Sequence, residues 1–251
     1  MTNPHGSFCF AELHTADVEG AKRFYGDVFG WKAVDSRVEG YTLFQLNGKD
    51  VAGLRRVEHS SSRWIPLLSV ASADATSAKA LQLGASVVTP PTETGDLAQT
   101  AVLRDPAGGT LGLWEARGHA GAALLDEPGS LWWAELLTRD VAVAKTFYSN
   151  LLGWRAIDTL KYGIRYSVFK LGDDSLAGLL PIGADWGAVS PYWQILFAVD
   201  SCDARVERAR KAGGSLVFGP NDVPNAGRAA IVSDPREAVL VLMQPLPGGG
   251  S

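Results

Sequence analysis

The chain has 251 residues, of which 46% are hydrophobic and 20% are charged, and its formal net charge is −4. Its basic residues are scattered, which argues against nucleic acid or an acidic membrane surface as a partner. No apolar run approaches the roughly 20 residues of a membrane span, and the first residues lack the pattern of a signal peptide. The two cysteines, Cys9 and Cys202, have no metal-type spacing and are expected to be buried thiols. Together these features predict a cytoplasmic protein.

One sequence pattern occurs twice in the chain. The stretch FCFAELHTAD at residues 8–17 is matched by LWWAELLTRD at residues 131–140, and a run containing FY and then GW follows each. These early matches are 123 positions apart, whereas the Asp-Pro pairs at residues 105–106 and 234–235 are 129 apart. A tandem duplication with a longer middle in the second copy explains both offsets.

The first copy predicts a fixed order of elements. FAELHT alternates apolar and polar residues, as a strand does. Asp17 is placed to cap a helix that Gly30 ends, and one face of this helix collects Val18, Ala21, Phe24, Tyr25 and Val28. Strands follow around the turn NGKD and at residues 64–70. A second helix then covers DATSAKALQLG, and the last strands flank the turn DPAGG.

Each copy therefore predicts two successive units, and each unit consists of a strand, a helix and three further strands in that order. We expect an α+β fold in which four βαβββ units form two tandem domains, residues 7–116 and residues 130–246. Residues 117–129 have the small-residue composition of a linker between them.

Four consecutive βαβββ units, with FY and GW after the first helix and DP in the last hairpin, resemble the vicinal oxygen chelate superfamily. This superfamily includes glyoxalase I, bleomycin-resistance proteins and extradiol dioxygenases. The resemblance spans about residues 8–245, and the pattern is most similar to two-domain glyoxalase-like proteins of actinomycetes. It implies mixed, curved sheets that form open cups. Members include metal isomerases, dioxygenases, thiol transferases and drug binders, so the fold alone does not decide the function.

The resemblance also implies where a metal would be held. Metal enzymes of the superfamily place ligands on inner strands of each cup, and the matching positions here are Phe10, Gly53, Ile65, Gly112, Trp133, Gly178, Gln194 and Val241. Zinc, nickel and iron are usually held by His, carboxylate or thiolate, and none of these eight residues provides such a group. We therefore expect no metal and no other cofactor.

Strand alternation adds residues to the side on which Phe10 lies, since residues two apart point the same way. Glu12 and His14 are expected on that side in the first copy. Trp133 and Glu135 are expected on the matching side in the second. Two interpretations of Glu12 and Glu135 stay open. Each is either a buried structural carboxylate that pairs with an arginine or a backbone group, or a contact for a ligand.

His14 breaks the symmetry of the repeat, because its partner in the second copy is Leu137. If it is functional, His14 acts as a hydrogen-bond donor or general base in the first cup, tuned by Glu12. The alternative is a half-exposed histidine at a strand end without a functional role. Other residues expected to line the cups are Tyr41, Arg55, Trp64, Tyr166, Trp193, Gln194 and Arg228.

Large aromatic surfaces with a few polar groups suit a flat, mostly apolar ligand. We expect metal-free binding of an aromatic or hydrophobic small molecule, such as an antibiotic or secondary metabolite, for sequestration, resistance or as an accessory to biosynthesis. One alternative is a metal-independent isomerase, cyclase or lyase that uses Glu12 and His14 as acid and base. Another is an interaction protein with vestigial cups. Because the duplication already supplies four units, a monomer or a homodimer is expected.

Overall fold

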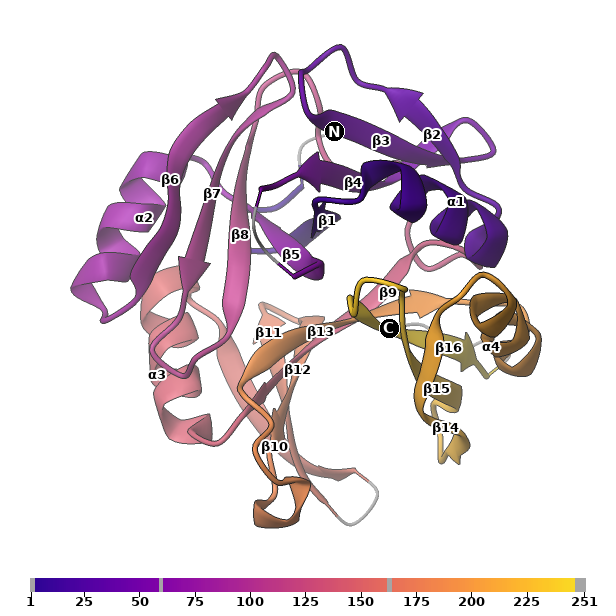
Figure 1. Ribbon diagram of the computed structural model, residues 1–251. Coiled ribbons are helices and arrows are strands. Elements are labelled where there is room, and N and C mark those ends of the chain that lie inside the picture. Colours follow the sequence, from indigo (N-terminus) through magenta and orange to yellow (C-terminus); the bar gives the residue numbers. More distant parts are fainter. Residues whose placement is uncertain (1–2, 59–60, 162–163, 247–251) are drawn as a thin grey trace. The chain divides into compact units, whose positions relative to one another are not determined.

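The computed structural model describes residues 3–58, 61–161 and 164–246 (Figure 1). In this part of the chain, no helix is long and apolar enough to cross a membrane. The first copy consists of β1 (Phe8–Thr15), α1 (Val18–Phe29), β2 (Lys32–Asp35), β3 (Tyr41–Leu46), β4 (Lys49–Arg56), β5 (Arg63–Ser69), α2 (Ala73–Gln82), β6 (Ser86–Thr94), β7 (Ala98–Arg104) and β8 (Thr110–Ala116).

The second copy repeats this order of elements, with one short 3₁₀ helix added. It consists of β9 (Leu131–Thr138), α3 (Val141–Leu152), β10 (Arg155–Lys161), β11 (Ile164–Leu171), β12 (Asp174–Pro181), η1 (Ala184–Trp186), β13 (Tyr192–Ala198), α4 (Cys202–Lys211), β14 (Ser215–Val223), β15 (Gly227–Ser233) and β16 (Val239–Pro245).

The strands form two mixed sheets, one for each copy. The strand order is β2-β3-β4-β1-β5-β8-β7-β6 in the first sheet and β10-β11-β12-β9-β13-β16-β15-β14 in the second. In each sheet the first strand of a βαβββ unit pairs in parallel with the last strand of that unit, and hairpins supply the antiparallel pairs. The predicted α+β fold with four βαβββ units is confirmed.

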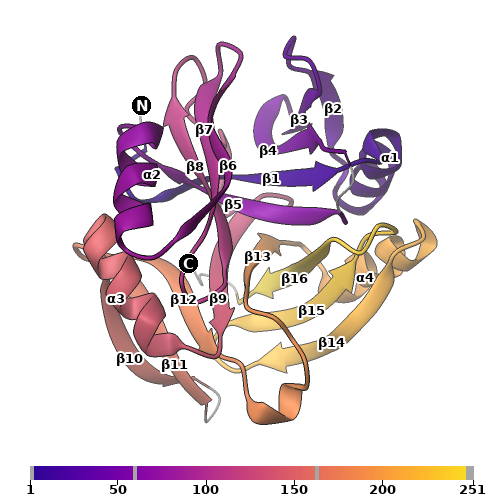
Figure 2. The ribbon, with the colours of Figure 1, turned by 60° about the vertical axis from the view of Figure 1, so that its left-hand side comes forward.

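The chain packs as two compact units, and each unit takes segments from both copies. Unit 1 contains Met1–Cys9, Pro66–Gly121 and Trp133–Gln194. Unit 2 contains Phe10–Ile65, Ala122–Trp132 and Ile195–Ser251. Helices α2 and α3 therefore belong to unit 1, where α3 lies against β10 and β12 (Figure 2), and α1 and α4 belong to unit 2. The expected domains, residues 7–116 and 130–246, correspond to the two sheets and not to the two compact units. The domain limits and the linker stay a prediction.

The first helix of each copy begins and ends as its sequence predicts. Asp17 accepts a hydrogen bond from the backbone N–H of Gly20, and Asp140 accepts one from Val143. Gly30 ends α1 in the left-handed region, at a φ of 78°, which glycine adopts without steric cost. Each helix then buries its apolar face in the core of its unit.

The core of unit 2 contains a chain of hydrogen bonds between side chains. The indole Nε1 of Trp64 donates to the Tyr25 hydroxyl over 3.0 Å, and this hydroxyl donates to Oδ2 of Asp234 over 3.1 Å. The other carboxylate oxygen of Asp234 accepts the backbone N–H groups of Arg236 and Ala238. Asp234 therefore stabilises the Asp-Pro hairpin turn and also holds α1 in place through Tyr25.

Unit 1 contains the same chain, built from the matching residues. Nε1 of Trp193 donates to the Tyr148 hydroxyl over 2.9 Å, and this hydroxyl donates to Oδ2 of Asp105 over 2.5 Å. Oδ1 of Asp105 accepts the backbone N–H of Gly109. Burial raises the pKa of Asp105 and the pKa of Tyr148, because both groups lose water around their charged forms.

Replacing Tyr25 or Tyr148 by Phe is expected to lower the free energy of unfolding by about 1–3 kcal/mol. Each change leaves a buried indole N–H and a buried carboxylate oxygen without their shared partner. Urea unfolding measures the loss. Ser149→Ala, an exposed position next to Tyr148, is the matched control and should change stability by less than about 0.5 kcal/mol. Two Tyr variants as stable as this control would contradict the role of the hydroxyls.

Candidate functional site

In each unit the strands pack one side against the helices, and we call the opposite side the inner face of that unit. In unit 2, Ala11 and Leu13 of β1 lie in the core that α1 covers. Their neighbours Phe10, Glu12 and His14 therefore point to the inner face, because side chains alternate along a strand. Strand β1 pairs in parallel with β4, and this register places Gly53 and Arg55 of β4 beside Glu12 and His14, respectively.

Three charged or polar side chains meet on this face of unit 2. Oε1 of Glu12 lies 2.6 Å from Nε2 of His14 and accepts a hydrogen bond from Nε of Arg55 over 2.8 Å. Nη2 of Arg55 donates to the other carboxylate oxygen over 3.3 Å. Arg55 also covers the ring of Tyr41, with 4.9 Å between the guanidinium carbon and the ring centre. Only Arg55 reaches the surface, at 26% exposure, against 2% for Glu12 and 6% for His14.

The surroundings of Glu12 keep its carboxylate charged. Burial alone would raise the pKa of Glu12, but the Arg55 charge and the hydrogen bonds from His14 and Arg55 outweigh it and hold this pKa well below its ordinary value. An ionised carboxylate only accepts hydrogen bonds, so the hydrogen between Glu12 and His14 belongs to Nε2 of the ring.

Glu12→Gln is expected to lower the free energy of unfolding at about pH 7 by roughly 2–3 kcal/mol, because Arg55 loses its counter-charge in a mostly buried place. An acid whose pKa is lower in the folded state stabilises the fold above its unfolded pKa, about 4.3 for Glu, and loses that effect as the pH falls. The difference between wild type and variant should therefore shrink below about pH 4.

Denaturant unfolding between acidic and neutral pH measures this difference. Glu19→Gln removes an exposed acid that pairs with Lys22 and is the control, with an expected change below about 1 kcal/mol at any pH. A Glu12 difference that grows towards acid pH would contradict the assignment of a charged Glu12.

The inner face of unit 1 has more aromatic rings and is more exposed. Nε1 of Trp133 donates to the Tyr166 hydroxyl over 3.2 Å, and this hydroxyl donates to Oε1 of Glu135 over 2.7 Å. On β13 the Tyr192 hydroxyl donates to Oε1 of Gln194 over 2.9 Å. Burial raises the pKa of Tyr192 to about 12, and the Glu135 charge acts in the same direction, which brings the two groups into one cluster. Trp133, Glu135 and Tyr192 are each half-buried.

Tyr192 is a site residue that the sequence analysis missed. It is two residues before Gln194 on the same strand, so strand alternation already placed it on the same face. Its counterpart in the first copy, 129 positions earlier, is Arg63. Because tyrosine and arginine differ in chemistry, the comparison of the two copies did not identify Tyr192.

The two inner faces differ at one pair of neighbouring residues, and both members of the pair differ between the units. In unit 2 the parallel register places His14 beside Arg55, whereas the same register in unit 1 places Leu137 beside Leu180. Glu12 thus has a cation and an imidazole as partners, and Glu135 has the Tyr166 hydroxyl instead. Both carboxylates are hydrogen-bonded, as burial requires, and the partners of Glu12 include a histidine.

The residues present do not fit a metal centre of the type that the resemblance implies. Gly53 and Gly178 occupy two of the expected ligand positions, and a Cβ atom at either would overlap a tyrosine hydroxyl, that of Tyr41 or Tyr166. These hydroxyls thus take the space that a metal-ligating side chain would need. The described part of the chain contains no cluster of three or more His, Cys, Asp or Glu side chains that could hold a metal ion.

Gly53→Ala is expected to destabilise unit 2 by about 1–3 kcal/mol, because the new methyl group overlaps the Tyr41 hydroxyl. Tyr41→Phe in the same chain removes that hydroxyl and should recover part of the loss. A double-mutant cycle, measured by denaturant unfolding, should give a coupling energy of at least about 0.5 kcal/mol. Gly26→Ala in α1 is the control, since a Cβ there has ordinary contact only. Additive effects of the two substitutions would contradict the proposed overlap.

Three residues predicted to line the cups lie elsewhere, which corrects those assignments. Trp64 and Trp193 belong to the hydrophobic cores under the helices, where they bind the tyrosine hydroxyls described above. They alternate with Ile65 and Gln194, so they point away from the inner face. Arg228 on β15 binds Asp203 of α4 with two nitrogens and also binds Asp222, and therefore lies on the helix side.

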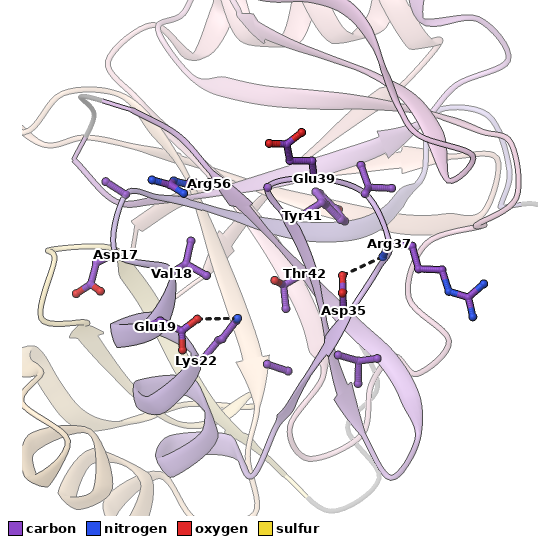
Figure 3. A pocket seen from close by; sticks show the side chains of 15 residues that line it. Asp17, Val18, Glu19, Lys22, Asp35, Arg37, Glu39, Tyr41, Thr42 and Arg56 are labelled. Carbon is purple, nitrogen blue, oxygen red and sulfur yellow. Dashed lines mark hydrogen bonds and ion pairs between the residues drawn. The ribbon is translucent and has the colours of Figure 1, made fainter.

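Unit 2 also has an open groove between the start of α1 and the β2–β3 region (Figure 3). It has a volume of about 760 Å³, and its labelled walls include Asp17, Lys22, Asp35, Arg37 and Arg56. Unit 1 has a groove of about 600 Å³ at the matching place. Mixed charges line the larger groove, which makes it less suited to an apolar ligand than the inner faces.

Comparison with family models gives two matches that cover most of the chain. Residues 7–113 match a glyoxalase-like domain. Residues 130–242 match the model described as glyoxalase/bleomycin resistance protein/dioxygenase superfamily.

Relatives and solved structures agree with these matches. The chain is 34% identical to CFP32 of Mycobacterium tuberculosis, named as a candidate glyoxylase, over 95% of this chain and 94% of that protein. It is 33% identical to the anthracycline biosynthesis protein DnrV of Streptomyces peucetius, over 98% of each chain. The fold is similar to the Mn(II)-bound glyoxalase from Novosphingobium aromaticivorans, with a TM-score of 0.66 and 18% identity over 97% of this chain and 83% of that chain.

Proposed function

Because the chain belongs to the glyoxalase, bleomycin resistance protein and dioxygenase superfamily, we propose that it binds a flat, largely apolar small molecule without using a metal. The ligand is an aromatic secondary metabolite or antibiotic, and the protein sequesters it or assists its biosynthesis. The name of DnrV, an anthracycline biosynthesis protein, supports this class of ligand.

The half-exposed aromatic cluster on the inner face of unit 1 is the observation that carries the proposal. Trp133 and Tyr192 offer partly exposed rings for stacking, and the buried Tyr166 holds Trp133 in place through its hydroxyl. Glu135 and Gln194 provide polar groups beside these rings. A few fixed polar groups among aromatic surfaces are typical of sites that orient a planar ligand.

The donor set supports binding without a metal. Two of the positions that would ligate a metal are glycines, and tyrosine hydroxyls fill the space beside them. Zinc, nickel and iron sites need several His, carboxylate or thiolate groups directed at one point. The tyrosine hydroxyls instead fill that space, and the hydroxyl of Tyr166 binds Trp133 and Glu135.

A second candidate function is a metal-independent isomerase, cyclase or lyase that uses His14 as a general base. The 2.6 Å contact between Glu12 and His14 favours it, since a carboxylate that orients an imidazole is a common device in acid–base catalysis. Glu12 then positions His14 and does not itself move a proton, because Arg55 and His14 keep it ionised. Turnover of a bound metabolite that His14→Ala abolishes would favour this function over binding alone.

Trp133→Ala is expected to weaken the binding of a planar aromatic ligand by about 1–3 kcal/mol, because the ligand loses a stacking surface. Titration with the anthracycline daunorubicin, followed by calorimetry, measures the affinity. Trp186→Ala, in the exposed η1 helix, is the matched control and should leave the affinity unchanged. If daunorubicin and simpler planar aromatics all fail to bind the wild-type chain, the proposed function is wrong.

A further inference from the structure

Arg63 is a cation on the inner face of unit 2 that the proposed function does not use. It belongs to β5 and precedes Trp64, whose ring lies in the core under the helices. Because side chains alternate along a strand, Arg63 points to the inner face, where it is partly exposed. Its Nε atom is nevertheless buried and has no hydrogen-bond partner among the described residues. A buried donor without a partner costs free energy, so this atom needs an explanation.

The neighbours of Arg63 explain why the protein itself does not pair with it. Ile65, the next residue of β5 on the same face, is apolar. Strand β1 lies beside β5 in the sheet, and a hydrogen bond of 2.7 Å joins the side chains of Ser62 and Thr15. This contact places Arg63 beside His14, which is the residue before Thr15. Neither neighbour offers Arg63 a counter-charge.

The carboxylate of β1 is already bound by another cation. Oε1 of Glu12 accepts from Nε of Arg55 over 2.8 Å, and Oε2 accepts from Nη2 over 3.3 Å. Arg55 and Glu12 thus neutralise each other, whereas Arg63 makes no ion pair with the described residues. An arginine is always charged in a protein, so the inner face of unit 2 retains one positive charge without a counter-charge.

The second copy meets the same position in a different way. Tyr192 is the counterpart of Arg63 in unit 1, and its hydroxyl donates to Oε1 of Gln194 over 2.9 Å. Ile65 is the counterpart of Gln194 and cannot accept a hydrogen bond. In unit 1 the donor and its acceptor are therefore both present on the strand, and in unit 2 only the donor is.

We propose that Arg63 binds the carboxylate of a small organic molecule on the inner face of unit 2. The carboxylate accepts from Nε and from one Nη nitrogen, in the side-on arrangement that Arg55 makes with Glu12. One guanidinium without a counter-charge matches a monocarboxylate. A dianion such as a phosphate monoester would leave its second charge unpaired on a face that already carries Glu12. This site uses residues of unit 2 only and does not depend on the function proposed for unit 1.

Two probes of the same shape test the proposal. Cyclohexanecarboxylate carries the charge, and cyclohexanecarboxamide replaces it with a neutral amide. Their saturated ring offers no flat surface for stacking on the aromatic cluster of unit 1. Wild-type protein is expected to bind the carboxylate roughly 10-fold or more tightly than the amide, because hydrogen bonds between charged groups are the strong ones. Thermal unfolding at rising concentrations of each probe, at about pH 7, measures both affinities.

Two variants of Arg63 and one control assign the preference to this side chain. Arg63→Met is expected to abolish the preference for the carboxylate, whereas Arg63→Lys keeps the charge and should retain part of it. Arg23→Met removes the same charge from an exposed position of α1 and should leave the preference unchanged. Trp133→Ala, which acts on unit 1, should also leave it unchanged.

The stability of the ligand-free variant gives an independent check. Because Arg63 has no partner within the described part of the protein, Arg63→Met should leave the thermal midpoint unchanged or raise it. A midpoint lowered by more than about 3 °C would show that the guanidinium has a structural role, and would overturn the proposal.

The binding results decide the rest. Equal affinity of the wild-type chain for both probes, no binding of the carboxylate up to about 10 mM, or a preference that survives in Arg63→Met each overturns the proposal. These outcomes leave the function proposed for unit 1 standing, because daunorubicin binding and its loss in Trp133→Ala test that function separately.

Discussion

The chain of hydrogen bonds from tryptophan through tyrosine to aspartate is the interaction on which each compact unit depends. In unit 2 it joins β5, α1 and the turn before β16, whose residues Trp64, Tyr25 and Asp234 are far apart in the sequence. Because the cluster is buried, each of its polar atoms needs a partner inside the protein, and the loss of one member leaves the others unsatisfied. The two copies therefore retain these residues together, and their inner faces differ instead.

The inner faces show how one architecture accommodates different polar groups. A carboxylate that is wholly or partly buried needs hydrogen-bond partners, and the two units provide them in different ways. Glu12 binds Arg55 and His14, whereas Glu135 binds the Tyr166 hydroxyl and leaves its neighbours on β9 and β12 apolar. The arrangement around Glu12 orients an imidazole, and the arrangement around Glu135 leaves aromatic rings partly exposed. The duplication thus provides two faces with distinct chemistry.

Glycines occupy two of the positions at which the resemblance to metal enzymes of the superfamily implies metal ligands. At Gly53 and Gly178 the absence of a side chain makes room for the hydroxyl of Tyr41 or Tyr166. A tyrosine hydroxyl in that space donates and accepts hydrogen bonds, a function suited to an organic ligand rather than to zinc or iron. Placing a metal-ligating side chain at either position would therefore require the tyrosine to move.

The sequence by itself determined the order of elements, the helix caps at Asp17 and Gly30, and the side of the strand that Glu12 and His14 share, because capping and alternation are local properties. It could not decide that Trp64 and Trp193 belong to the cores, since the tyrosines and aspartates that bind their indoles come from distant segments. The sequence also could not show that Arg55 binds Glu12 or that Arg228 binds Asp203 of α4. Only the tertiary structure decided these partners, because a buried charge takes its role from the groups that packing brings beside it.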